Sequence, residues 1–125
     1  LDNLKSYTLN DKIFDKVNNA WVVQNNGKLC IAYQTKENEY NARSFEDAFI
    51  HINRNFVNTN RNEFMGLKNR ESFDVANTDA YDLATNCVKK KTYFAMDILF
   101  HTNDKYDNWQ IPSYIREGLL WLKKD

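Results

Sequence analysis

A single apolar stripe between residues 45 and 56 places the strongest constraint on how this chain can fold. Its members stand at positions i, i+3, i+4, i+7 and i+11, which is the pattern of one face of an α-helix. Burying each large side chain of such a stripe contributes about 1.5–3 kcal/mol before entropy is counted, so the helix must pack on a core. The pattern predicts one continuous helix whose buried face carries Phe45, Ala48, Phe49, Ile52 and Phe56.

The chain before this helix predicts one short helix and two strands. Ile13, Phe14 and Val17 have helical spacing, and Asp11 is placed to cap such a helix. Residues 21–23 and 29–33 read as strands, and the second is almost continuously apolar, which indicates burial on both faces.

Turn signals separate these elements. Asn25-Asn26-Gly27 stands between the two predicted strands, and Asn and Gly tolerate the positive φ angles that tight hairpin turns require. We therefore expect a hairpin that joins residues 21–23 to residues 29–33. Residues 34–40 are polar, and we expect them to form a loop.

The chain after the stripe predicts further helices. Phe64, Met65 and Leu67 indicate a short helix with weak periodicity. Thr78 is placed to cap a helix over residues 80–88. A stripe then predicts a helix that runs to about His101, with an apolar face formed by Phe94, Ala95, Ile98 and Leu99.

Pro112 marks the start of the last predicted helix. Its missing N–H costs nothing in a first helical turn, where no acceptor is available for that group. Ile115, Leu119 and Leu122 then recur on one face, which we expect to point inward.

Length and composition indicate a folded domain of mixed α/β class. The chain has 125 residues, of which 42% are hydrophobic, with only 3 Gly and 1 Pro, so a disordered or fibrous state is excluded. A domain of this size buries roughly two-thirds of its unfolded surface. We predict a single domain, residues 1–125, in which several helices pack around a small sheet.

Charge and cysteine content indicate which partners and which cellular compartment suit the protein. The formal net charge is +0, so any contact with nucleic acid must come from a local patch. Cys30 and Cys87 lie far apart without metal-ligand spacing, which favours reduced thiols in an intracellular protein. No apolar run approaches the roughly 20 residues of a membrane span, and no signal peptide opens the chain, so we expect a cytoplasmic location.

The first residue is not Met, and the chain opens in a polar segment. We therefore expect a fragment of a longer protein. The chemistry of the whole protein would then be divided between this chain and segments outside it.

Ser44, Glu46 and Asp47 form the first candidate site. The simpler interpretation is structural: Ser44 caps the helix, and Asp47 completes something close to a capping box. The functional interpretation is a metal site, because Ser44 and Glu46 bring two oxygen donors to one helix entry. Mg²⁺ and Mn²⁺ favour such ligands, although one carboxylate cannot hold the ion alone.

Lys89-Lys90-Lys91 forms the second candidate site. A solvated charge run that closes the preceding helix is the simpler interpretation. Lys91, however, falls in the first turn of the next predicted helix, where a cation opposes the helix dipole at a cost of about 0.3–1 kcal/mol. A lysine beside free N–H groups is well placed to hold a phosphate. His51 and His101 do not have the spacing of a metal pair.

Three separated segments share a pattern with a known family. Together and in this order they resemble the late part of the Toprim nuclease domain in OLD-family ATP-dependent endonucleases. The Arg-Ser-Phe-Glu-Asp-Ala-Phe block is the most specific part of the resemblance. The segments are Ala32-Tyr33-Gln34 with Tyr40-Asn41-Ala42-Arg43-Ser44-Phe45-Glu46-Asp47-Ala48-Phe49, then Lys91-Thr92-Tyr93-Phe94-Ala95-Met96-Asp97, and Trp109-Gln110-Ile111-Pro112-Ser113-Tyr114-Ile115-Arg116-Glu117-Gly118-Leu119.

The resemblance implies a part of a DNA-cutting enzyme. Members join an ATPase domain to a Toprim domain that cuts DNA with two metal ions, Mg²⁺ or Mn²⁺, and are associated with bacteria and phage defence. Their Ser-x-Glu metal ligands correspond to Ser44 and Glu46, and their phosphate-stabilising lysine corresponds to Lys91, or to Lys90 in a register one residue away. The family's Asp-x-Asp motif and its ATP-binding domain have no counterpart in this sequence.

Two functional hypotheses follow. The first is the C-terminal part of a metal-dependent, OLD-family DNA endonuclease, with the rest of the same chain and a second copy as candidate partners. The second is a non-catalytic helical module for protein contacts. A shared concave surface for Glu46 and Lys91 would favour the first hypothesis, and opposite faces would favour the second.

Overall fold

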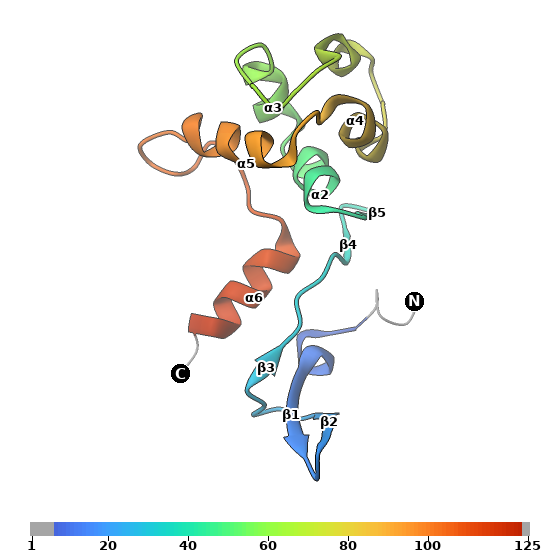
Figure 1. Cartoon of the computed structure of the whole chain (residues 1–125), viewed down its shortest axis with the longest axis vertical. Helices are drawn as coiled ribbons and strands as arrows, with labels where there is room; N and C mark the ends of the chain where they lie inside the picture. The colour runs from blue at the N-terminus through green and yellow to red at the C-terminus, as the bar shows by residue number, and fades with distance from the viewer. Residues whose placement is uncertain (1–6, 124–125) are drawn as a thin grey trace. The chain divides into compact units, whose positions relative to one another are not determined.

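A computed structural model describes residues 7–123, which divide into two compact units. The first unit contains residues 7–41 and 112–123, and the second is Ala42–Ile111. The first unit holds strands, a short 3-10 helix and one α-helix, and the second is helical (Figure 1). The mixed α/β class is therefore confirmed. The prediction of a single domain over residues 1–125 stays a prediction.

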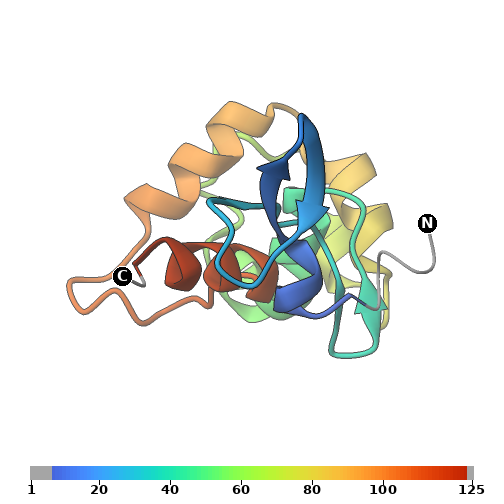
Figure 2. The same ribbon diagram turned by 90° about the horizontal axis from the view of Figure 1, so that it is seen from below.

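The first unit contains a three-stranded antiparallel sheet. The 3-10 helix η1 (Leu9–Lys12) leads into β1 (Ile13–Val17), which pairs with β2 (Ala20–Val23) and with β3 (Leu29–Cys30) in the order β2-β1-β3. Figure 2 shows β1 and β2 lying side by side.

The predicted helix over Ile13, Phe14 and Val17 is wrong. Asn18 and Asn19 take φ angles of 51° and 66°, which is the left-handed backbone that a tight hairpin turn needs. The turn folds the segment back as β1, with Phe14 opposite Val23 in β2. Pairing between strands thus overrode a weak helical spacing.

The hairpin predicted at Asn25-Asn26-Gly27 is also wrong, because β2 and β3 both pair with β1 rather than with each other. The segment does turn, since the backbone N–H of Gly27 donates to the carbonyl of Gln24. A Cβ at Gly27 would lie 2.2 Å from the carbonyl oxygen of Phe14, so only glycine fits. β3 is short and is not buried on both faces, because Leu29 is exposed.

The predicted loop over residues 34–40 contains a small hairpin. β4 (Lys36–Glu37) pairs antiparallel with β5 (Tyr40–Asn41). Asn38 and Glu39 turn the chain between them with positive φ angles.

The last helix, α6 (Ser113–Lys123), begins directly after Pro112 as predicted. The carbonyl of Pro112 accepts hydrogen bonds from the N–H groups of Ile115 and Arg116. The expectation that Leu119 and Leu122 face inward is wrong, because both are exposed. An ion pair of 3.0 Å joins Glu117 of the helix to the buried Lys12.

In the second unit the predicted long helix is interrupted. α2 (Phe45–Ile52) begins after Ser44, and α3 (Arg54–Asn60) follows a break at Asn53. The Asn53 side chain donates to the carbonyl of Gln110 and accepts from its N–H, at 2.7 and 2.6 Å. This tertiary pairing explains why the helix stops where the apolar stripe continues.

The short helix predicted around Phe64, Met65 and Leu67 is absent from the described residues, and turns take its place. Phe64 and Leu67 are nevertheless buried, and Leu67 pairs with Val88 in an isolated β-bridge. The 3-10 helix η2 (Arg70–Asp74) follows.

α4 (Ala80–Cys87) is capped by Asp79, whose carboxylate accepts from the N–H of Tyr81. The predicted cap, Thr78, instead donates its hydroxyl to the carbonyl of Val75. α5 (Lys91–Phe100) starts and ends where the sequence predicts.

An aromatic cluster forms the core of the second unit. The ring of Phe49 contacts those of Phe56 and Phe94 with centroids 6.0 Å apart, and Phe64 packs against both partners. Such edge-to-face pairs add to the burial energy of the rings. Of the stripe predicted for α5, Ile98 and Phe94 are buried, whereas Ala95 and Leu99 are exposed. The cluster holds the starts of α2 and α5 on one core.

Candidate active site

Ser44 sits at the N-terminus of α2 and is tied into its cap. Its hydroxyl donates to a carboxylate oxygen of Asp47 at 2.6 Å and accepts from the Asp47 N–H at 3.3 Å. The buried Asp47 carboxylate also accepts from the backbone N–H groups of Arg43 and Ser44. The predicted capping box is confirmed, and it fixes the backbone of residues 43–47 as one rigid turn.

Glu46 lies in the same first turn of α2, but the surroundings of its carboxylate differ from those of Asp47. Only 8% of its surface is exposed. Within residues 7–123 its carboxylate forms no hydrogen bond and no ion pair, in contrast to Asp47 beside it. Burial of a carboxylate without a partner is unfavourable, and the positive end of α2 offsets part of that cost.

Lys91 is the first residue of α5, as the sequence predicts. Its positive charge therefore lies at the positive end of the helix dipole, which is unfavourable. Its side chain is exposed and is unpaired within the described part of the chain. Lys90, the alternative residue, is the N-cap, and its ammonium lies over the ring of Tyr93 at 4.8 Å. Of the two lysines, Lys91 is the one that lines a pocket with Glu46.

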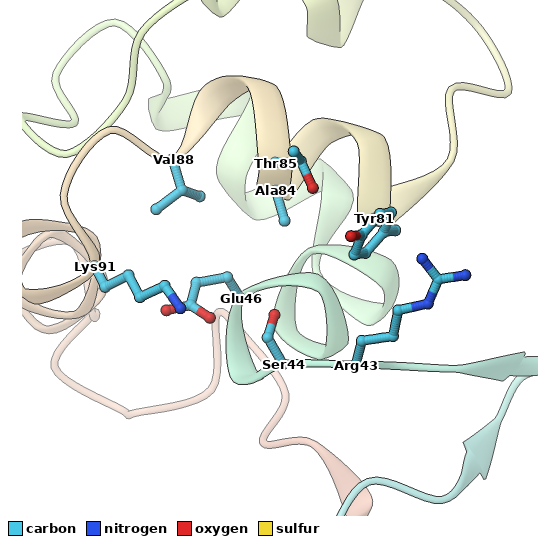
Figure 3. A pocket seen from close by; sticks show the side chains of 8 residues that line it. All are labelled: Arg43, Ser44, Glu46, Tyr81, Ala84, Thr85, Val88 and Lys91. Carbon is cyan, nitrogen blue, oxygen red and sulfur yellow. The ribbon is translucent and has the colours of Figure 1, made fainter.

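That pocket is a cavity of about 380 Å³ within the second unit. It is built by the entry of α2, one face of α4 and the start of α5. Figure 3 shows the Glu46 carboxylate and the Lys91 ammonium pointing toward one another, with Ser44 on the same side. The lining residues are Arg43, Ser44, Glu46, Tyr81, Ala84, Thr85, Val88 and Lys91.

Sequence reasoning missed the α4 side of this pocket. Tyr81 and Thr85 are four residues apart, so they share one face of α4 and present a ring and a hydroxyl. The guanidinium carbon of Arg43 lies 4.0 Å from the centroid of the Tyr81 ring. The spacing of Tyr81 and Thr85 could have suggested a polar face, although nothing local indicates that it meets Arg43.

Two side chains at the entry of α2 carry oxygen atoms of the kind that hard cations prefer. Ser44 and Glu46 offer two oxygen donors, which suits Mg²⁺ or Mn²⁺. No group of three or more His, Cys, Asp or Glu side chains with metal-like geometry occurs in residues 7–123. An ion that takes about six ligands would therefore need waters, substrate oxygens or further acids as well. The roles assigned to Ser44, Glu46 and Lys91 stay predictions.

The histidines and cysteines lie outside this pocket. His101 faces the carbonyl of Asp97 through Nδ1 and the Glu63 carboxylate through Nε2, at 2.9 and 3.2 Å. Both Cys30 and Cys87 are free thiols. Desolvation by burial raises the pKa of each, and Cys87 is fully buried. These thiols are poor nucleophiles, because reactivity requires the thiolate.

No helix among the described residues combines the length and the apolar character needed to cross a bilayer.

Comparison with known proteins gives one distant relationship. The chain is similar to a protein of Bacillus cereus (strain HuB5-5) named Endonuclease GajA, with 27% identity over 132 residues. The match covers 97% of this chain but only 19% of that protein. No family model and no solved structure matches the chain. The comparisons thus support a relationship to an endonuclease, and the chain spans about a fifth of that relative's length.

Proposed function

We propose that this chain is part of a metal-dependent DNA endonuclease of the OLD type, and that it belongs to the Toprim region of such an enzyme. The main support is that Glu46 and Lys91, which are far apart in sequence, line one pocket. The resemblance of their motifs supports the OLD and Toprim assignment, and the similarity to an endonuclease supports the coarser reading of a nuclease. An enzyme of this kind acts on DNA in the bacterial cytoplasm, and phage defence is one context for it.

The proposed reaction is hydrolysis of a phosphodiester. A water oxygen forms a bond to phosphorus, and one phosphorus–oxygen ester bond breaks. One product keeps the phosphate, and the leaving oxygen takes a proton to become a hydroxyl, so no oxidant or reductant is needed. Bound Mg²⁺ or Mn²⁺ supplies charge neutralisation on the reacting oxygens. Lys91 would face the negative charge that builds up on the phosphate in the transition state.

Ser44 and Glu46 would hold the cation. The Ser44 proton points at Asp47, so a lone pair of its oxygen remains available for a cation. Glu46 supplies the negative charge, and its lack of another partner among residues 7–123 leaves both oxygens available. Asp47 would then be a positioning residue, because its carboxylate accepts a hydrogen bond from the Ser44 hydroxyl and so fixes the orientation of that hydroxyl.

The remaining parts of the enzyme would come from segments that this chain does not contain. These are the other acidic ligands and the ATP-binding domain that the resemblance implies, with a second copy of the chain as a further candidate partner. We expect the 125-residue chain alone to bind divalent metal weakly and to cut no DNA. Robust, EDTA-sensitive nicking by the purified chain would contradict this division of the site.

The test uses the longest natural protein that carries this sequence. Supercoiled plasmid is incubated with Mg²⁺ or Mn²⁺, and its conversion to nicked and linear forms is followed over time. We expect Glu46→Ala and Lys91→Ala to lower the cleavage rate by about 100-fold or more, in line with the loss of one transition-state contact. Glu71→Ala and Lys105→Ala are matched controls, because both side chains are exposed and lie outside the pocket. Wild-type rates for both pocket variants would defeat the proposal.

The alternative, a module for protein contacts, rests on the outer face of α5. Tyr93, Met96 and Phe100 are exposed there, and Phe100 has 77% of its surface accessible. A helix that is apolar on both faces is usually covered by another element. Such a contact is compatible with nuclease activity, so the alternative would replace the main proposal only if the pocket variants cut normally.

A further inference from the structure

We infer that Arg43, held against the ring of Tyr81, binds a backbone phosphate of the DNA. This phosphate neighbours, on the same strand, the phosphate at which the strand is cut. This inference rests on the proposed function, because it names a second contact for the substrate of the same pocket. No role for either residue follows from the sequence motifs discussed above.

The first observation is that Arg43 is fixed at both ends. Its backbone N–H donates to the Asp47 carboxylate at 3.0 Å, so the start of its side chain belongs to the rigid cap of α2. Its guanidinium lies on the Tyr81 ring, with the carbon 4.0 Å from the ring centroid. Stacking of a guanidinium on an aromatic ring is favourable and restricts the motion of the side chain. An arginine held at both ends loses little entropy when it binds a ligand.

The second observation is that the hydrogen-bonding edge of this guanidinium is unused. Stacking engages only the flat face of the group and leaves its N–H donors in the plane available. Within the described range the Arg43 side chain makes no hydrogen bond and no ion pair. Arg54 and Arg70 differ in this respect, because their guanidinium groups donate to backbone carbonyls. A free, planar fork of donors matches the geometry of a phosphate group.

The third observation is the order of charges along the pocket. Figure 3 shows Lys91 at one end and Arg43 at the other, with Glu46 and Ser44 between them. The lining therefore carries two cations and one carboxylate, which is a net charge of +1 in a chain whose formal net charge is +0. A strand with regularly spaced phosphates would place its reacting phosphate at Lys91, Glu46 and Ser44 while a neighbouring phosphate reaches Arg43. An isolated small anion would not need both ends.

The experiment measures DNA binding by the longest natural protein that carries this sequence. A short fluorescein-labelled DNA duplex is titrated in EDTA buffer, so that no cleavage occurs, and the dissociation constant is measured at several salt concentrations. We expect Arg43→Ala to weaken binding about tenfold at low salt. It should also reduce the slope of log K against log salt by about one, since one phosphate contact is lost.

Arg43→Lys and Tyr81→Leu both keep a positive charge at residue 43 but change how it is presented, and two further variants serve as controls. Arg43→Lys keeps the charge but not the planar fork, so we expect several-fold weaker binding with an unchanged salt slope. Tyr81→Leu removes the platform and should have the same signature, whereas Tyr81→Phe should bind as the wild type does. Lys105→Ala is the matched control for loss of one positive charge, and its slope should not change.

In the cleavage assay Arg43→Ala should raise KM and leave kcat within about twofold, because the contact is equally strong in the ground state and the transition state. An unchanged dissociation constant and salt slope for Arg43→Ala would overturn the inference while leaving the cleavage results for Glu46 and Lys91 intact. Normal cleavage by the Glu46 and Lys91 variants would instead overturn the proposed function. A reduced salt slope for Arg43→Ala would still show its phosphate contact.

Discussion

The carboxylate of Asp97 accepts a hydrogen bond of 2.8 Å from the backbone N–H of Gly66. A second bond of 2.9 Å reaches the other carboxylate oxygen from the N–H of Met65. The carbonyl of Gly66 in turn accepts from the N–H of Lys89 at 2.8 Å. A Cβ at Gly66 would lie 2.4 Å from the backbone nitrogen of Phe94, so the loop packs directly on α5. These contacts join the loop to α5, the helix that begins at Lys91.

The first prediction concerns the two hydrogen bonds that the Asp97 carboxylate accepts from the N–H groups of Met65 and Gly66. Asp97→Asn replaces one of two carboxylate acceptors by an NH₂ group, which leaves a buried backbone N–H without a partner. We expect the free energy of unfolding to fall by about 1–3 kcal/mol. Urea denaturation followed by circular dichroism measures the change. Asp104→Asn, in an exposed loop, is the matched control and should change it by less than about 0.5 kcal/mol. Equal stability of the two variants would show that these two hydrogen bonds do not stabilise the fold.

The second prediction concerns the cap of α2. Ser44→Ala removes the acceptor of the Asp47 N–H and the donor to its carboxylate, so we expect a loss of about 1–2 kcal/mol in unfolding free energy. Ser44→Thr keeps the hydroxyl and should recover most of that loss. Thermal melts of the three proteins provide the comparison. A fully stable Ser44→Ala protein would show that the capping box contributes nothing.

The third prediction separates function from stability at Glu46. Glu46→Gln keeps the shape of the side chain and removes its charge. The helix dipole favours the charge and burial disfavours it, so the two effects offset one another. We expect the unfolding free energy to change by less than about 1 kcal/mol while plasmid cleavage by the longer protein is lost. A large loss of stability with retained cleavage would mark Glu46 as a structural residue.

The fourth prediction concerns alkaline pH. Desolvation by burial raises the pKa of Cys87 in the folded protein, so the unfolded chain loses its thiol proton at a lower pH than the folded one. The contribution of this thiol to the unfolding free energy is therefore complete below the ordinary thiol pKa, and it is lost as pH rises from that value through the raised pKa of the folded protein. Between about pH 8 and about pH 10 we expect the wild type to lose stability more steeply than Cys87→Ala, with a limit near 1.4 kcal/mol per pH unit. Urea melts across this range, under reducing conditions, test it, and parallel curves would refute it.

Some features of this protein follow from local sequence. Ser44 starts α2, Lys91 starts α5 and Pro112 precedes α6, as the sequence predicts. Each boundary depends on groups within about one helical turn, such as a capping hydroxyl or a missing N–H. The candidate residues Ser44, Glu46 and Lys91 could likewise be selected from the sequence, because the selection used only residue type and local spacing.

Other features were decided by tertiary structure. Residues 13–17 form a strand because the Asn18-Asn19 turn pairs them with β2, and α2 stops because Asn53 binds the backbone of Gln110. The pocket likewise requires α2, α4 and α5 to pack on one aromatic core, which brings Tyr81 under Arg43. Periodicity reports which face of an element is apolar, but it carries no information on which distant residue will meet that face.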